Sequence, residues 1–167
     1  MTDARPRVPR EADERETLTA WLDYHRATLM MKCDGLSHEQ LRERSVPPSS
    51  MSLLGLVRHM ADVERGWFRR GVGGEKAPPH YYSDENPEGD FDDVDTADVD
   101  EAFAAWRDDV EQARAAAAAV PSLDHVVGTG GGRCSVRWIM THMIEEYARH
   151  NGHADLLRER IDGAVGD

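Results

Sequence analysis

Apolar residues recur along this chain at intervals of three and four positions, which is the spacing of one face of an α-helix. The pattern predicts four long helices separated by breaks rich in Gly and Pro. We expect these helices over about residues 11–32, 50–71, 98–120 and from 134 or 135 to about 160. Ser37 and Gln40 have the spacing of a capping box, which predicts a short helical turn between the first two helices.

Four helices and two long connections predict an all-α fold, a four-helix bundle with long crossover loops. A chain of 167 residues is long enough for one domain with its own core, so 1–167 is expected to be a single domain. Residues 1–10 are expected to form a flexible N-terminus. The glycine run GTGGGR at 128–133 lacks a Walker lysine, and we expect a flexible linker there rather than a phosphate loop.

The net charge of −12 is concentrated in one segment of the chain. Ten acidic residues lie between Asp84 and Glu101, and the surrounding stretch at 77–99 predicts a long, solvated acidic loop. The chain has no basic stripe that could follow a phosphate backbone, so nucleic-acid binding is not expected. No apolar stretch approaches the roughly 20 residues of a membrane span, and nothing resembles a secretory signal. We therefore expect a cytoplasmic protein without membrane contact.

The fourth predicted helix places two ionisable residues beside its apolar face. With 100° per residue and Met143 at the centre of the apolar stripe, His150 lies about 20° and Glu146 about 60° from that centre. A carboxylate so close to a core must be neutralised, paired or bound to a metal, because burying it alone costs several kcal/mol or more. Four residues apart on one helix, Glu146 and His150 can converge on one point.

His59 is a third candidate ligand, from the second predicted helix. It lies between Leu56 and Val63 at helical spacing, on the flank of an apolar stripe. Facing helices of a bundle can bring such a residue opposite Glu146 and His150, and a His2Glu set with an open position is typical of catalytic zinc. Taken singly, each residue also has an ordinary explanation. His59 fits a hydrogen-bonded histidine at the boundary of the core, Glu146 a surface carboxylate paired with an arginine, and His150 a hydrogen-bonded core histidine. Spacing alone therefore leaves the metal site open.

Two segments of the chain carry a resemblance to a known superfamily. SLLGLVRHMADVERGWF at 52–68 and HMIEEYARHNGHADLLRE at 142–159 resemble the two signature helices of the DinB-like (YfiT-like) superfamily of metal-dependent four-helix-bundle proteins. This superfamily includes the bacillithiol and mycothiol S-transferases and the metal-binding domain of mycothiol-dependent maleylpyruvate isomerase. The resemblance implies that His59, Glu146 and His150 hold one divalent metal ion, zinc in preference to nickel or iron. Many members have histidine where this chain has Glu146, and the isomerase branch resembles this chain there.

The same resemblance implies a function. It implies a metal-dependent thiol S-transferase in which mycothiol, activated as a metal-bound thiolate, attacks a small electrophile, as in detoxification. Two alternatives stay open: a metal-dependent hydrolase that uses metal-bound water, and a noncatalytic metal-binding, stress-associated protein. The sequence names neither the electrophile nor the oligomeric state, and a homodimer is an alternative to a monomer.

Other residues are expected to surround this site. The resemblance implies that Arg158 and Trp67 contact the thiol cofactor, although an ion pair and a core position would also account for them. His153 and His142 flank the site on the helical wheel, on the same side as Glu146. His153 is a candidate fourth ligand or proton carrier, and a surface or supporting role is the alternative.

We expect the loop at 77–99 to border the open coordination position and to decide which substrate enters; a mobile loop that only connects two helices is the alternative. Its only cluster able to stack on or hydrogen-bond a ligand consists of His80, Tyr81 and Tyr82. Neither Cys33 nor Cys134 is expected to be a catalytic nucleophile. Cys33 lies at the C-terminal end of a predicted helix, where the helix dipole and the charge of the following aspartate disfavour a thiolate.

Overall fold

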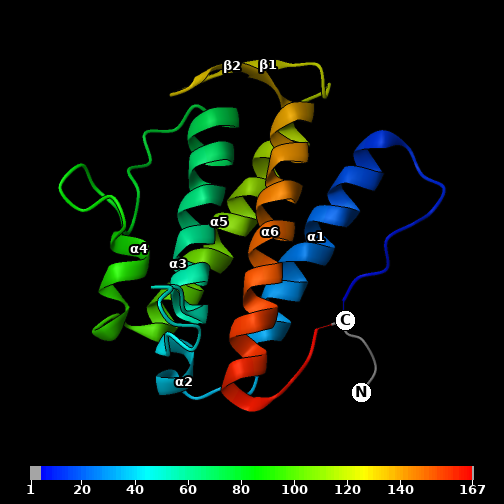
Figure 1. Ribbon diagram of the computed structural model, residues 1–167. Helices are drawn as coiled ribbons and strands as arrows, with labels where there is room; N and C mark the ends of the chain where they lie inside the picture. Colours follow the sequence, from blue (N-terminus) through cyan, green and yellow to red (C-terminus); the bar gives the residue numbers. More distant parts are fainter. Residues whose placement is uncertain (1–4, 167) are drawn as a thin grey trace.

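The computed structural model describes residues 5–166, which fold into the expected all-α architecture. Four long helices pack as a bundle (Figure 1). They are α1 at Glu14–Cys33, α3 at Leu53–Glu64, α5 at Val99–Ala119 and α6 at Val136–Asp162. The shorter elements are α2 at His38–Arg42, a π-helical extension of α3 named η1 at Arg65–Val72, α4 at Gly89–Asp92, a 3₁₀ turn at Asp93–Asp95, and the strands β1 at Val126–Thr129 and β2 at Gly132–Ser135. The predicted four-helix bundle is therefore confirmed.

Side-chain caps explain where the helices begin. Five helices start at a residue whose side-chain oxygen accepts a hydrogen bond from a first-turn N–H, namely Asp13, Ser37, Ser52, Asp98 and Ser135. Ser37 and Gln40 form the predicted capping box. At the other end of α6, Gly163 has a φ of 80°, the left-handed conformation that closes many helices. None of the helices within residues 5–166 is both long enough and apolar enough to cross a membrane.

The glycine run at 128–133 is not the flexible linker expected from the sequence. It forms the tip of an antiparallel hairpin in which Thr129 pairs with Gly132. Gly132 has a φ of 125°, a backbone conformation that glycine adopts without a steric penalty. Each strand has four residues, too few to produce an alternation from which a strand is predicted. The hairpin lies across one end of the bundle, next to η1 and the start of α6 (Figure 1).

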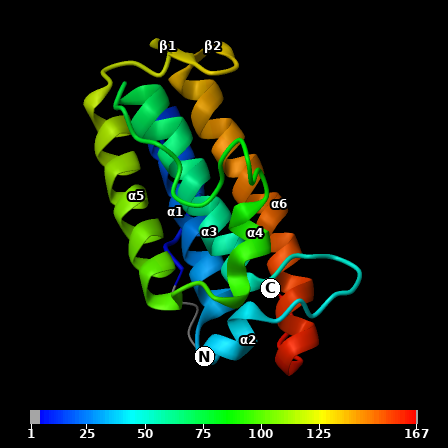
Figure 2. The same cartoon turned by 90° about the vertical axis from the view of Figure 1, so that its left-hand side faces the viewer.

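The acidic loop is only partly solvated. Its middle folds into α4, which lies against α3 (Figure 2). Gly55 of α3 permits this approach, since a Cβ there would lie 2.8 Å from Cδ1 of Phe91. Arg58 holds the same turn by donating hydrogen bonds to the backbone oxygens of Gly89 and Asp90. The expectation of a solvated loop is therefore wrong for this part, because contacts with α3 bury it.

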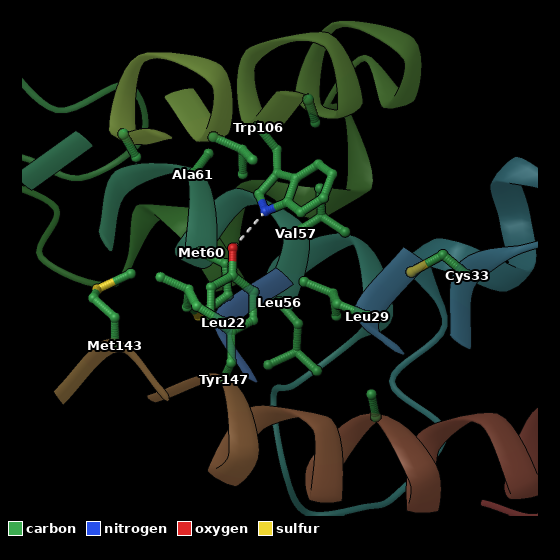
Figure 3. Packing of buried hydrophobic residues seen from close by; sticks show 14 of the residues in the cluster. Leu22, Leu29, Cys33, Leu56, Val57, Met60, Ala61, Trp106, Met143 and Tyr147 are labelled. Atoms are coloured by element: carbon green, nitrogen blue, oxygen red, sulfur yellow. Dashed lines mark hydrogen bonds between the residues drawn. The ribbon is translucent and has the colours of Figure 1, made fainter. Parts of the chain in front are cut away.

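The core contains a hydrogen-bonded network among its apolar side chains. Trp106 donates from Nε1 to the hydroxyl oxygen of Tyr147 at 3.0 Å (Figure 3). The Tyr147 hydroxyl in turn donates to Glu64 at 2.8 Å, and Arg26 donates to both oxygens of Glu64 at 2.7 Å. The Glu64 side chain has no exposed surface, so the charge of Arg26 compensates its buried carboxylate. The network joins α1, α3, α5 and α6.

Candidate metal centre

Two adjacent helices of the bundle bring three candidate ligands together. His59 comes from the middle of α3, and Glu146 and His150 come from successive turns of α6. One ligand atom of each residue lies within 4.8 Å of the other two, and the ring centroids of His59 and His150 are 4.7 Å apart. All three residues are partly buried. The structure thus gathers, in one place, the three residues that the sequence singled out.

The ring of His59 is oriented by a carboxylate from the acidic loop. Its Nδ1–H donates a hydrogen bond of 2.8 Å to Oδ2 of Asp90, whose side chain is only 6% exposed. This bond leaves Nε2 of His59 as the nitrogen available to a metal, as in the carboxylate–histidine pairs of zinc sites. Sequence reasoning assigned Asp90 to a solvated loop. The neighbouring Phe91, an aromatic residue within the acidic run, was the one signal that this turn packs against the bundle.

Glu146 lies between two histidines of its own helix. Its two oxygens are 3.2 Å from Nε2 of His142 and 3.5 Å from Nε2 of His150. Burial, together with the nearby His59 and His153, lowers the pKa of His150 to about 4. His150 is therefore a neutral imidazole near pH 7, which is the form that binds metal ions.

The donor set fits a divalent metal ion. Two imidazoles and one carboxylate, partly shielded from water, are ligands that zinc and other first-row metals accept. His142, Glu145 and Glu146 form a second group that shares one residue with the first. Glu145 is exposed, and within residues 5–166 the carboxylate that faces Nδ1 of His142 is that of Glu145, not a buried one comparable to Asp90. The cluster of His59, Glu146 and His150 is the better-formed site.

A cavity of about 760 Å³ opens beside His59. One face of α3 and η1 forms its floor, and the acidic loop and the hairpin tip form its walls. Its apolar lining includes Val63, Trp67 and Phe91, and the ring of Phe91 lies 5.3 Å from that of His59; the glycine run of the hairpin also lines the cavity. The cavity has the size of a small-molecule site and lies next to the ligand cluster.

The comparison with known protein families matches residues 17–163 to the family described as Mycothiol-S-transferase. The chain belongs to this family. The match runs from α1 to the end of α6 and is consistent with the DinB-like superfamily, so the resemblance seen in the two signature helices is confirmed. A search of curated proteins found no match.

The other residues expected around the site lie in three different places. Trp67 lines the cavity, and its ring packs edge-on against His142 at 4.8 Å. Nδ1 of His153 lies 3.4 Å from Nδ1 of His150, beside the cluster. Arg158 is not brought to the cavity. Its guanidinium instead bonds to Asp162 and to two backbone oxygens at the end of α1, those of Lys32 and Asp34.

Of the three loop residues expected to meet a ligand, the structure places only Tyr82 on the cavity. Nε2 of His80 bonds to the buried carboxylate of Asp109 at 2.7 Å. Tyr81 donates its hydroxyl to Glu101, and the guanidinium of Arg58 lies over its ring at 4.1 Å. His80 and Tyr81 therefore attach the loop to α3 and α5, and of this cluster only Tyr82 lines the cavity.

The two thiols differ in environment, and we expect them to react differently. Burial raises the pKa of the Cys33 thiol to about 12, whereas Cys134 is partly exposed on β2. Ellman's reagent should label one thiol in the native protein and two in denaturant, and Cys134→Ser should remove the native signal.

A variant with both cysteines changed to serine should keep any transferase activity. Loss of activity with metal content intact would contradict this expectation.

Proposed function

We propose that this protein is a metal-dependent mycothiol S-transferase that joins the sulfur of mycothiol to a small electrophile. The position of His59 is the observation that supports this most. His59 belongs to the ligand cluster and also lines the cavity, so a thiol held at the cluster could meet a second molecule in the cavity. The description of the family names both the thiol and the type of reaction.

His59, Glu146 and His150 would hold the metal ion. When bound, zinc would supply the Lewis acidity that keeps a thiol deprotonated near neutral pH. Asp90 keeps the ring of His59 in one orientation, and burial keeps His150 neutral and ready to bind. Glu146 would bring a negative charge that a third histidine would not, which would make a group bound to the metal somewhat less acidic.

The apolar part of the cavity would hold the second reactant. Val63, Trp67 and Phe91 offer an apolar surface beside His59, where an electrophile can be held with little water around the sulfur nucleophile. In the reaction a sulfur–carbon bond forms, the leaving group departs with its electron pair and the proton of the thiol passes to solvent.

The decisive experiment incubates zinc-loaded protein with mycothiol and monochlorobimane and follows conjugation by fluorescence. The proposal expects a rate above that of the uncatalysed reaction, and removal of the metal by a chelator should abolish this excess. Hydrolysis of a panel of esters and amides without thiol would instead support a hydrolase. If zinc-loaded protein shows no activity in either assay with several electrophiles, the result would support a noncatalytic metal-binding protein.

Asp90→Asn is expected to weaken zinc binding by about 10- to 100-fold. The amide oxygen can still accept the hydrogen bond from His59, but the negative charge that favours the ligand is gone. Competition with a chromophoric chelator measures the change in Kd. Asp92→Asn is the matched control, because Asp92 is exposed on the same short helix α4. Equal affinities of the two variants would show that the carboxylate of Asp90 does not support the metal ligand.

A further inference from the structure

The floor of the cavity is one continuous face of α3 and η1. From His59 it continues at helical spacing through Val63, Gly66 and Trp67 to Arg70. Gly66 lies seven residues after His59, which corresponds to roughly 10 Å along a helix. The cavity thus joins the ligand cluster at one end to an arginine at the other, with apolar side chains between them.

The guanidinium of Arg70 is folded back over Gly66. A Cβ on Gly66 would lie 2.8 Å from Nη2 of Arg70, so the missing side chain leaves room for the guanidinium to lie there. Arg70 donates from Nη1 to the backbone oxygen of Ala77 and from Nη2 to the hydroxyl of Tyr82. An arginine has five N–H donors, so these two bonds hold the group in place and leave most of its donors for a ligand.

Unlike its neighbours Arg65 and Arg69, Arg70 has no carboxylate partner within residues 5–166. Arg65 pairs with the buried Asp109, and Arg69 pairs with both Asp109 and Glu75. The chain has 32 acidic and 20 basic residues, yet no carboxylate in the described part forms an ion pair with Arg70. The positive charge of Arg70 is therefore available to a molecule in the cavity.

Three acidic residues also line the cavity, and within residues 5–166 none of them forms an ion pair with Arg70. The side-chain oxygens of Asp62 accept hydrogen bonds from the backbone N–H groups of His80 and Tyr81, and Asp90 accepts a hydrogen bond from His59. Glu88 is exposed at the rim of the cavity. Arg70 is the only basic side chain, histidine apart, among the lining residues of this cavity in the described chain.

We propose that Arg70 binds an anionic group of the electrophile. This inference rests on the proposed function and adds the substrate class: an electrophile with a flat apolar body and a carboxylate or similar anion on the side away from the reacting carbon. Its body would lie along Val63, Trp67 and Phe91, and its reacting carbon would face His59. Arg70 and Tyr82 would select such molecules over uncharged analogues of the same shape.

Binding without turnover provides the first test. The probes are 4-methylbenzoate and 4-methylbenzamide, which share one shape and differ in charge, and NMR titration through the indole N–H signal of Trp67 measures each Kd. Arg70→Gln should weaken binding of the benzoate by about 10- to 100-fold and leave the benzamide unchanged, because only the charged probe loses a charge-assisted hydrogen bond. Arg70→Lys should recover part of the loss. Arg107→Gln, at an exposed position on α5 outside the cavity, is the control and should change neither value.

Kinetics with the reactive pair 4-(chloromethyl)benzoate and 4-(chloromethyl)benzamide provide the second test. In both molecules the thiol sulfur bonds to the benzylic carbon, chloride leaves with the electron pair and the thiol proton passes to solvent. Arg70→Gln should raise KM for the benzoate alone and leave KM for mycothiol unchanged.

An unchanged ratio of benzoate to benzamide affinity in Arg70→Gln, with the fold intact by circular dichroism, would overturn the proposal. If neither chloromethyl compound is conjugated while the benzoate still binds through Arg70, the transferase function fails and the anion site stands.

Discussion

Glu64→Ala is expected to lower the free energy of unfolding by about 3–5 kcal/mol. The substitution leaves the guanidinium of Arg26 buried without a countercharge, and it removes the acceptor of the Tyr147 hydroxyl in the middle of the core. Urea denaturation followed by circular dichroism measures the loss. Glu111→Ala is the control, since Glu111 is exposed on α5 and its removal should change stability by less than about 0.5 kcal/mol.

A double variant separates the charge effect from the packing effect. Replacing Arg26 and Glu64 together by methionine removes both charges and retains apolar volume, so much of the lost stability should return. A double variant as unstable as Glu64→Ala would show that the hydrogen bond from Tyr147 to Glu64, rather than charge compensation, stabilises this part of the bundle.

The helices could be predicted because their apolar residues face one common core. The 3.6-residue period gave the four long helices to within a few residues at most ends, and the Ser37 capping box gave the short α2. Glu64 carried a further signal, since it lies four residues after Met60 and four before Phe68, on the apolar stripe of α3. A glutamate at such a position predicts a buried partner, but the sequence does not say that the partner is Arg26, 38 positions earlier.

The candidate site was predictable in part, for a similar reason. Glu146 and His150 are neighbours on one helix, so their convergence follows from helical geometry, whereas the approach of His59 needed the resemblance. Asp90 was missed because its contact with His59 is made from the loop, where no period restricts which residue turns inward. Arg70 was missed because helical spacing places it on the face of His59 but does not show that a cavity lies over that face. The hairpin beside them was missed because its strands are only four residues long.

His150→Ala is expected to abolish stoichiometric zinc binding and, with it, the transferase activity that we propose. His150 provides one of three candidate ligands, and removing it leaves His59 and Glu146, too few protein donors for a stable catalytic zinc site. Metal analysis after gel filtration should give about one zinc per wild-type chain and a small fraction of that in the variant. His153→Ala is the matched control, because His153 lies three residues away on α6 and the cluster contains three ligands without it.

Two outcomes would change this interpretation. Undiminished zinc in His150→Ala would mean that the metal binds elsewhere, and the second group of His142, Glu145 and Glu146 would be the next candidate. An equal loss in His153→Ala would make His153 a fourth protein ligand. In that case no coordination position would be left open for a thiol, and the zinc would stabilise the bundle rather than take part in a reaction.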